Sequence, residues 1–307
     1  MMWVDYPIDR SSHEYATPTS GGLGLVVFVS VTFVWVLKGL DGGAVPLVLG
    51  GLAIAIIGLV DDLRSLPIAP RLFVQAIGMA AAIYSIGPVE RIDLGGMEIE
   101  LAPLTLAIIW IAGIWFINLY NFMDGIDGIA SAEAAFIGLL AGALALPLAP
   151  EIATAWLIVG GAACGLLVWS WPPARIFMGD VGSGFLGFII ASLLVLSLQR
   201  GVFSLSTVLV LVSPFLCDTT ITLLRRMLRG EAWYLGHRLH AYQHLARRWS
   251  GHRRVTIASI FLNVFLVAPS AWLCVTEAEI APWVACCVLG VSAVIVLAAG
   301  AGHPESR

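Results

Sequence analysis

Charged residues and paired cysteines are the scarcest features of this 307-residue sequence. Only 12% of its residues are charged and 59% are hydrophobic, whereas a soluble globular domain has about 25% charged and about 45–50% apolar residues. The five cysteines form no Cys-x-x-Cys pair and lie in or beside apolar runs, so neither a zinc site nor a disulfide framework is indicated. The composition excludes a soluble domain and indicates a membrane protein.

A cleavable signal peptide and long polar linkers are also missing. The first 22 residues are polar, so the first apolar run must direct the chain to the membrane. No repeat or low-complexity segment divides the sequence. We therefore expect one integral-membrane domain over residues 1–307.

What the sequence has in abundance is long apolar runs, of the length needed to cross a hydrocarbon core about 30 Å thick. The runs do not alternate with a period of two, which favours helices over barrel strands. The expected fold is an all-α polytopic membrane protein of about ten transmembrane helices. They are predicted at 22–40, 44–60, 71–87, 103–119, 130–148, 152–171, 184–199, 203–223, 255–275 and 281–300.

Basic residues are distributed unequally between the predicted loops. If both termini are cytoplasmic, 13 of the 16 Lys and Arg residues fall on the cytoplasmic side, and Lys38, Arg91 and Arg200 fall outside. This distribution obeys the positive-inside rule. It places four loops in the cytoplasm, at about 60–71, 119–130, 172–183 and 224–254. The external segment 88–102 alternates around Gly95-Gly96 and predicts a small β-hairpin.

Polar side chains gather in those four cytoplasmic loops. The stretch NLYNFMDGIDG spaces two amides and two carboxylates three residues apart: Asn118, Asn121, Asp124 and Asp127. At this spacing they stay near one helix face for two turns, and polar groups at a membrane boundary are costly unless paired or functional. The adjacent pair Asp61-Asp62 could simply be solvated at a helix end, but it is predicted on the same face.

The segment FMGDVGSG places Asp180 among glycines directly before an apolar run. An ordinary helix cap by Asp180 or Ser183 would explain it. The free N–H groups of a helix start and the close approach that glycine permits also suit a phosphate. With the other carboxylates nearby, a magnesium–pyrophosphate site is the better interpretation, because Mg²⁺ prefers oxygen ligands and often takes several of them from the substrate.

The last cytoplasmic loop is rich in arginine and histidine. His237, His240 and His244 have the spacing of one helix face. An amphipathic helix on anionic lipids would have this composition, and three histidines could suggest zinc, although no sulfur ligand accompanies them. Arginine beside histidine, as in Arg238, suits phosphate recognition better.

These motifs together resemble those of the polyprenyl-phosphate N-acetylhexosamine-1-phosphate transferases. The resemblance rests on the Asp61-Asp62 pair, Asn-x-x-Asn-x-x-Asp-Gly-x-Asp-Gly at 118–128, Phe-Met-Gly-Asp-x-Gly-Ser at 177–183 and His-Arg-x-His at 237–240, and it begins at residue 7. It implies transfer of a sugar 1-phosphate from a UDP-N-acetyl sugar to a polyprenyl phosphate such as undecaprenyl phosphate. The products are a polyprenyl-diphospho-sugar and UMP, and the cofactor is Mg²⁺, with Mn²⁺ as a substitute.

The resemblance also assigns roles to the polar residues. The expected catalytic residues are Asp61, Asp62, Asp124, Asp127 and Asp180, and the expected substrate-binding residues are Asn118, Asn121, Asp127, His237, Arg238 and His240. Asp180 is the first choice as a Mg²⁺ ligand and Asn121 the second, which leaves Asp61 and Asp62 to orient or deprotonate the polyprenyl phosphate. No nucleic-acid partner is expected, and a homodimer is left open.

The loop sequence HRLHAYQHL favours the branch that initiates O-antigen and other surface polysaccharides, in the bacterial inner membrane. The related phospho-N-acetylmuramoyl-pentapeptide transferases carry consecutive histidines there. A lipid-linked sugar flippase is the alternative from a different class. Transporters place ionisable groups near the midplane, whereas here the acids are predicted at one surface, which favours an enzyme.

Overall fold

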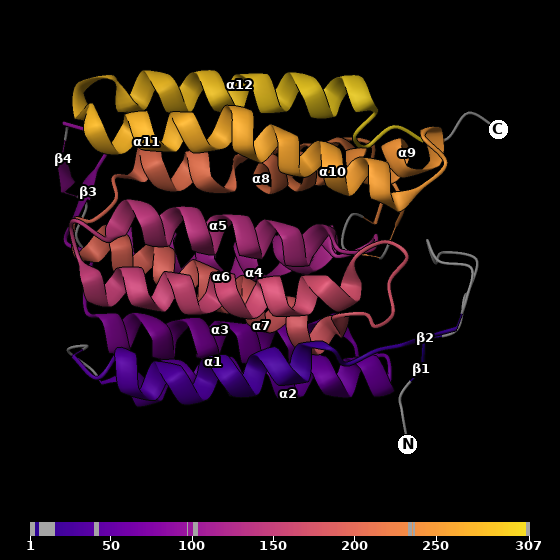
Figure 1. The fold of residues 1–307 in the computed structure, drawn as a ribbon, viewed down its shortest axis with the longest axis horizontal. Helices are drawn as coiled ribbons and strands as arrows, with labels where there is room; N and C mark the ends of the chain where they lie inside the picture. The colour runs from indigo at the N-terminus through magenta and orange to yellow at the C-terminus, as the bar shows by residue number, and fades with distance from the viewer. Residues whose placement is uncertain are drawn as a thin grey trace.

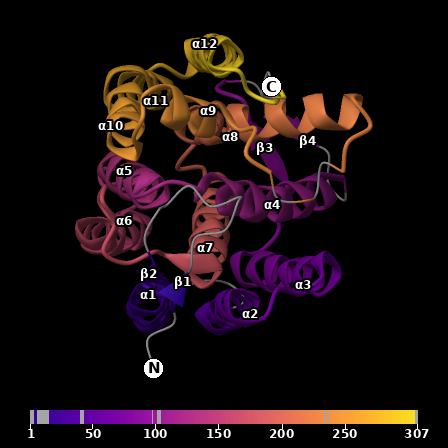
Figure 2. The ribbon, with the colours of Figure 1, turned by 90° about the vertical axis from the view of Figure 1, so that its right-hand side faces the viewer.

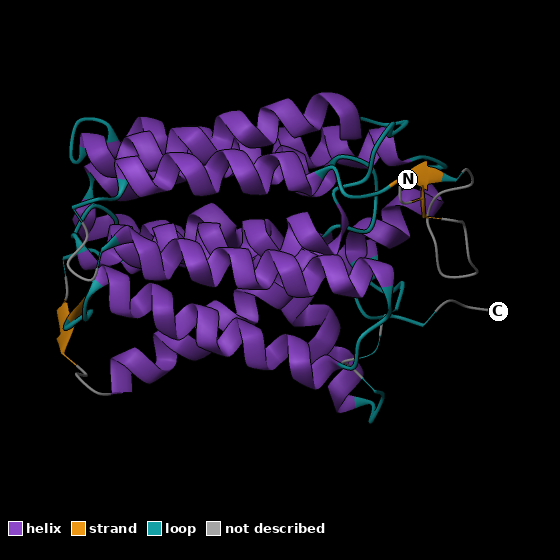
Figure 3. Ribbon diagram, turned by 90° about the horizontal axis from the view of Figure 1, so that it is seen from below, coloured by secondary structure: helices purple, strands orange, loops and turns teal. Residues whose placement is uncertain are grey.

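The computed structural model describes residues 4–5, 16–39, 43–96, 98–100, 104–232, 235 and 237–304. Residues 7–15 of the first motif lie outside the described residues. Helices make up nearly all of the described chain, and its strands lie toward the two ends of a long bundle (Figure 3).

The chain forms twelve numbered α-helices, two further helical turns and four short strands in the described ranges. They are β1 (Val4–Asp5), β2 (Thr17–Pro18), α1 (Gly22–Val36), α2 (Ala44–Leu63), α3 (Ile68–Ile86), β3 (Arg91–Asp93), β4 (Glu98–Glu100), α4 (Leu104–Met123), α5 (Ile129–Ala145), α6 (Pro150–Ser170), α7 (Gly179–Gln199), α8 (Leu205–Leu228), α9 (Ala241–Arg248), α10 (His252–Leu262), the π-helical turn η1 (Asn263–Val267), α11 (Ala268–Thr276), the 3₁₀ turn η2 (Ala278–Ile280) and α12 (Ala281–Ala299).

The all-α membrane fold predicted from the apolar runs is confirmed. Within the described ranges, eight helical segments are long and apolar enough to cross a membrane, and α10, η1 and α11 form one of them. Helices α1 and α5 are shorter apolar helices at two further predicted spans. The chain is therefore a multi-pass membrane protein. Several predicted ends are wrong by up to five residues. Helix α7 begins at Gly179 rather than 184, and α8 continues to Leu228 rather than 223, so Arg225 and Arg226 belong to this helix and not to the following loop.

The predicted hairpin is also present. Strands β3 and β4 pair antiparallel, with Arg91 opposite Glu100. Asp93 Oδ1 accepts the N–H groups of Gly95 and Gly96 at 2.7 and 3.0 Å, which stabilises the turn. The hairpin lies at the opposite end of the bundle from α9 and β2 (Figure 1).

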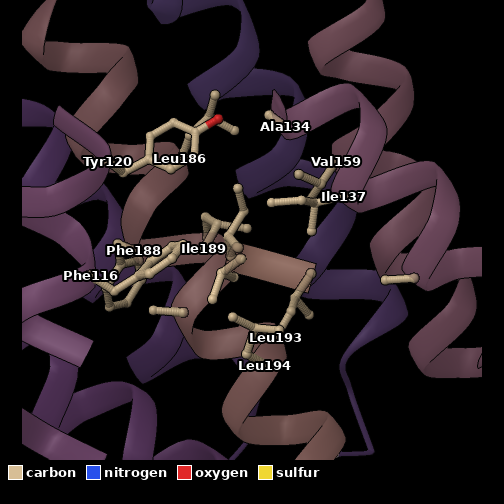
Figure 4. Close-up of a cluster of buried hydrophobic side chains, with 14 of the residues drawn as sticks. Phe116, Tyr120, Ala134, Ile137, Val159, Leu186, Phe188, Ile189, Leu193 and Leu194 are labelled. Carbon is tan, nitrogen blue, oxygen red and sulfur yellow. The ribbon is translucent and has the colours of Figure 1, made fainter. Parts of the chain in front are cut away.

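Helix α7 lies at the centre of the bundle, with α1 to α6 arranged around it (Figure 2). Every residue from Val181 to Ser197 is buried. Apart from three serines these residues are apolar or glycine, as expected of a helix enclosed on all sides. Its side chains Leu186, Phe188, Ile189, Leu193 and Leu194 form a cluster with residues of α4, α5 and α6 (Figure 4). The start of α7 is thereby fixed in the middle of one end of the bundle.

Glycines allow the neighbouring helices to approach that start closely. A Cβ added at Gly58 of α2 would lie closer than 3.0 Å to backbone atoms of Asp180 and Val181. A Cβ at Gly22 of α1 would meet the backbone of Gly182 in the same way. Small residues at membrane helix contacts permit this packing. The position of Asp180 therefore depends on two glycine contacts.

Replacing Gly58 by alanine is expected to destabilise the protein and reduce its activity, because the new methyl group must displace the start of α7. Overpacking of this kind costs about 1–3 kcal/mol. The matched control is Gly161→Ala in α6, where an added Cβ has no atom within 4 Å. Thermal unfolding and turnover in detergent are the measurements. Equal behaviour of the two variants would show that the α2–α7 contact does not restrain Asp180.

A buried polar pair joins α5 to the helix formed by α10, η1 and α11. Glu133 is 1% exposed and its Oε2 accepts a hydrogen bond from Asn263 Nδ2 at 2.6 Å. Asn263 is the first residue of the π-helical turn η1. The pair lies within apolar helices, where polar side chains are expected to find partners in neighbouring helices.

Candidate active site

Three of the four predicted motifs meet at the end of the bundle opposite the β3–β4 hairpin. Asp61 and Asp62 lie in the last turn of α2, Asn118 and Asn121 in the last turns of α4, and Asp180 in the first turn of α7. Since α2 and α4 both pack against α7, their polar ends converge on its start. The fold therefore brings together groups that are separated by up to 119 residues in the sequence.

Arg71 of α3 lies at the centre of this convergence. Its guanidinium forms an ion pair with Asp61 Oδ2, donates to Asn121 Oδ1 at 3.3 Å and lies 3.6 Å from Asp180 Oδ2. Asn121 in turn donates from Nδ2 to Asp180 Oδ1 at 2.9 Å and to Ser183 Oγ at 2.8 Å. The result is one network in which oxygen atoms of Asp61, Asn121 and Asp180 face the same cationic group.

Asp62 has a different position from its neighbour. Its two carboxylate oxygens accept the backbone N–H groups of Asp180 and Val181, at 2.8 and 3.2 Å. These N–H groups belong to the first turn of α7, where helical N–H groups have no partner within the helix. Gly179 precedes them at φ +75°, and a Cβ there would lie 2.7 Å from Asp62 Oδ2. Asp62 thus fixes the backbone of Asp180 at the start of α7.

The predicted helical row of amides and acids is interrupted, which corrects the sequence prediction. Helix α4 ends at Met123, so Asn118 and Asn121 are helical while Asp124 and Asp127 lie in the following turn. Asn118 pairs with Gln75 of α3, donating to its Oε1 at 2.7 Å. The four side chains therefore do not form one face.

Asp124 and Asp127 consequently have separate surroundings. Burial, followed by the charges of Asp180, Asp62 and Asp127, raises the pKa of Asp124 well above its ordinary value. This accumulation of carboxylates favours a bound cation. Asp127 faces the other way: its Oδ2 accepts the N–H of Ala174 at 3.0 Å, and its Oδ1 lies 3.1 Å from His252 Nδ1.

The histidines of the last loop do not share a helix face, which is a second correction. Helix α9 begins at Ala241, so His237 and His240 precede it and only His244 is helical. The rings of His237 and His240 stack at a centroid distance of 4.7 Å, and each lies beside the ring of Phe122, at 6.4 and 6.2 Å. Phe122 is two residues before Asp124, so the histidine pair lies next to the acidic turn.

His237 is placed to donate a hydrogen bond. Its Nδ1 accepts the N–H of Leu239 at 3.3 Å, and burial, the neighbouring His240 and Arg226 lower its pKa to about 3. The neutral ring therefore carries its hydrogen on Nε2. This atom is buried, and no described residue accepts from it. A phosphate oxygen is an acceptor that would satisfy this donor. The backbone carbonyl of Arg238 accepts from Arg247 at 2.9 Å.

Acidification is expected to destabilise this part of the protein. The pKa of His237 falls from 6.5 to about 3 on folding, so between these pH values the unfolded state binds more protons and stability falls as pH decreases. We expect the unfolding temperature to drop less between pH 7.5 and 5.5 in His237→Gln than in the wild type. His303→Gln, at an exposed histidine, is the control and should behave like the wild type. An identical drop in all three would contradict the assignment.

The sequence prediction missed several residues of the site. Arg71 was counted only as a cytoplasmic positive charge, and Gln75 lies one turn further along α3 within an apolar run. Their spacing of four residues puts both on one face of α3. Two polar residues on one face of an apolar helix are the pattern that could have indicated their place in the site. Asp218 of α8, which contacts the start of α9, lies inside a predicted span and gave no signal of its own.

The site fits a Mg²⁺ ion that shares its ligands with a phosphate substrate. Among the described residues no group of three His, Cys, Asp or Glu side chains is arranged to hold a metal ion alone. Mg²⁺, however, often takes one or two protein oxygens and completes its shell with water and phosphate. Asp180 and Asn121 offer such oxygens, which in this structure face the Arg71 guanidinium at 3.6 and 3.3 Å, so Arg71 would have to move aside for the ion.

Comparison with known proteins agrees with this chemistry. Residues 44–198 match the model of glycosyl transferase family 4. The chain is 31% identical over 289 residues to a probable undecaprenyl-phosphate N-acetylglucosaminyl 1-phosphate transferase of Bacillus subtilis (strain 168), covering 87% of this chain and 76% of that protein. It is 29% identical over 307 residues to the decaprenyl-phosphate N-acetylglucosaminephosphotransferase of Mycolicibacterium smegmatis, covering 86% and 73%.

A second kind of relative matches a shorter part of the chain. The phospho-N-acetylmuramoyl-pentapeptide-transferase of Moorella thermoacetica is 30% identical over 224 residues, covering 64% of this chain and 68% of that protein. By their names, the first two relatives transfer N-acetylglucosamine phosphate with a polyprenyl phosphate, and the third transfers a phospho-N-acetylmuramoyl-pentapeptide. The chain belongs to glycosyl transferase family 4, and it is an enzyme of the polyprenyl-phosphate sugar-1-phosphate transferase class.

Proposed function

We propose that the protein transfers N-acetylglucosamine 1-phosphate, or the 1-phosphate of a 6-deoxy N-acetylhexosamine, from its UDP derivative to undecaprenyl phosphate. The proposed product starts an O-antigen or other surface polysaccharide. The observation that carries the proposal is the Arg71–Asp61–Asn121–Asp180 network, together with the Nε2 donor of His237, from which no described residue accepts. These groups offer ligands for a cation and donors for a diphosphate within one end of the bundle.

In this reaction an oxygen of the acceptor phosphate forms a bond to the phosphorus that carries the sugar. The bond from that phosphorus to the UMP oxygen breaks, and UMP leaves with the electron pair. The protein therefore has to position the two phosphates and balance their charge. When Mg²⁺ is bound, it supplies much of the charge balance on the phosphate oxygens.

The proposed roles of the side chains follow from their contacts. Asp180 and Asn121 hold Mg²⁺, and Asp62 keeps Asp180 in place through the backbone of α7. Arg71 orients Asp61, and the pair faces the acceptor phosphate. The second pKa of a phosphate monoester is about 6, so at pH 7 this phosphate is mostly dianionic and needs orientation more than deprotonation.

The histidine loop is proposed to bind the donor. The neutral His237 donates from Nε2 to the diphosphate, with His240 stacked on its ring. Arg238, on the same loop, adds positive charge. Asn118 and Asp127 are proposed to stabilise the residues around the donor site. Asn118 bonds Gln75, and Asp127 accepts the N–H of Ala174.

The proposed orientation places this end of the bundle, and both termini, in the cytoplasm of a bacterial cell. The arginines between residues 225 and 254 support it. Reporter tags at residues 1 and 307 should both give a cytoplasmic signal. A periplasmic signal from one of them would contradict the orientation.

One assay tests the activity and separates the alternatives. The purified protein in detergent is incubated with undecaprenyl phosphate, Mg²⁺ and a panel of UDP-sugars, including UDP-N-acetylmuramoyl-pentapeptide, and UMP is measured. UMP release with an N-acetylhexosamine donor supports the proposal. Release with the muramoyl donor alone would assign the protein to the peptidoglycan branch. No release with any donor would contradict the proposed activity.

A further inference from the structure

Asp218 is a buried carboxylate on α8 that the reaction described above does not use. The residue is 3% exposed. Oδ1 accepts the N–H of Ala241 at 2.8 Å and the hydroxyl of Thr222 at 3.2 Å, and Oδ2 accepts the N–H of Tyr242 at 3.1 Å. A carboxylate within a membrane helix is costly unless it is satisfied in this way. Asp218 therefore connects α8 to the first turn of α9.

Helix α9 depends on such contacts for its position. It has eight residues, and an isolated helix of this length is not stable in water. A second anchor lies on the same turn: Tyr242 Oη donates to the carbonyl oxygen of Phe122 at 2.9 Å. A Cβ added at Gly125 would overlap the same hydroxyl. The start of α9 is thus held between Asp218 and the turn that carries Asp124.

The histidine pair is attached directly to this anchored start. His240 is the residue before α9 and is 1% exposed, and its Nδ1 lies 3.5 Å from Asp218 Oδ1 without a hydrogen bond between them. Its backbone N–H donates to Gln243 Oε1 at 3.3 Å. His237 stacks on the His240 ring. Asp218 therefore holds the backbone directly after His240, and through it the position of the stacked imidazoles beside the acidic turn.

We propose that Asp218 is a positioning residue for the transfer reaction: it fixes the start of α9 and the His240 ring so that the histidine pair faces the acidic turn. The inference rests on the proposed function, in which this pair contacts the donor diphosphate. Asp218 touches neither substrate. Its effect reaches the reaction through His240.

The experiment is a double-mutant cycle on the purified full chain, with donor kcat/KM measured from UMP release. Asp218→Asn keeps the shape of the side chain and removes its charge. Glu133→Gln is the matched control, since it makes the same chemical change at a carboxylate that is 1% exposed and bonded to Asn263. His240→Ala and the double variant complete the cycle. Amide exchange of residues 241–248 is followed in each variant.

We expect Asp218→Asn to lower donor kcat/KM by about thirtyfold, and Glu133→Gln by less than about threefold. In the His240→Ala background, Asp218→Asn should cost less than about threefold, because residues that act through one another are not additive. Amide exchange in α9 should rise in Asp218→Asn and stay unchanged in Glu133→Gln. A merely structural role would give additive losses instead.

The outcomes separate the two proposals. If the wild type is active and Asp218→Asn behaves like Glu133→Gln, or adds fully to His240→Ala, the positioning role is overturned and the proposed function stands. If the wild type releases no UMP from any donor, the proposed function fails, and the positioning role fails with it. Should Asp218→Asn not fold, Asp218→Glu, whose longer side chain moves the carboxylate away from the N–H groups of Ala241 and Tyr242, takes its place in the cycle under the same criteria.

Discussion

Replacing Asp180 by asparagine is expected to lower turnover by at least about 1,000-fold at ordinary Mg²⁺ concentrations. The substitution keeps the size of the side chain and its contact with Asn121 Nδ2, which lies 2.9 Å from Oδ1. It removes the negative charge of the carboxylate that we propose as a ligand of Mg²⁺. Phosphoryl transfer relies on charge balance at the non-bridging oxygens more than on covalent chemistry, so loss of this ligand should be among the most severe single changes in the protein.

A Mg²⁺ titration distinguishes this explanation from a loss of structure. We expect Asp180→Asn to shift the Mg²⁺ requirement sharply upward or to abolish activity at every concentration. Asp61→Asn, whose side chain faces Arg71 and the N–H of Leu66, should keep the Mg²⁺ dependence of the wild type and lose activity most steeply below about pH 6.5, where the acceptor phosphate begins to hold its proton.

The control for Asp180→Asn is Asp93→Asn in the β3–β4 hairpin, at the opposite end of the bundle. Asparagine can still accept the N–H groups of Gly95 and Gly96 there, so this variant should behave like the wild type. If the Mg²⁺ curve moves in Asp61→Asn and stays in place in Asp180→Asn, the two assigned roles are reversed.

The membrane helices and the β3–β4 hairpin were predictable because their signals are local. An apolar run of the length of α7 leaves few alternatives to a spanning helix, and Gly95-Gly96 between alternating residues marks a turn. Where the polar motifs gather was also predictable, since the positive-inside rule assigns each loop to a face. Which atoms meet within that face was not, because it depends on how α2, α3 and α4 are rotated around α7.

Two contacts illustrate that limit. Asp61 and Asp62 are adjacent and looked equivalent in sequence, yet one faces Arg71 and the other accepts N–H groups of α7. Neighbouring residues on a helix point about 100° apart, so only the packed structure decides which of them reaches which partner. The start of α9 is similar: the spacing of the histidines predicted one helix face, but the helix begins at Ala241, where Asp218 accepts its first N–H groups.

Arg71→Gln is expected to lower kcat/KM by about 100-fold or more, although no sequence motif includes this residue. The guanidinium is the one group that faces Asp61, Asn121 and Asp180 together among the contacts of the described residues. Without it, the carboxylates of Asp61 and Asp180 lose their shared cation, and their mutual repulsion disfavours the geometry that binds phosphate. Arg71→Lys keeps the charge but cannot contact Asp61 and Asn121 with two separate nitrogens, so it should retain intermediate activity.

The matched control is Arg64→Gln, an exposed arginine in the turn between α2 and α3, which should leave kcat/KM within about twofold of the wild type because exposed charges contribute little. The effect of Arg71→Gln should also shrink in an Asp61→Asn background, since neutralising this carboxylate removes part of the repulsion that the arginine offsets. Full additivity of the two losses would mean that Arg71 contacts a substrate phosphate directly rather than through Asp61. An Arg71→Gln variant as active as Arg64→Gln would remove Arg71 from the site altogether.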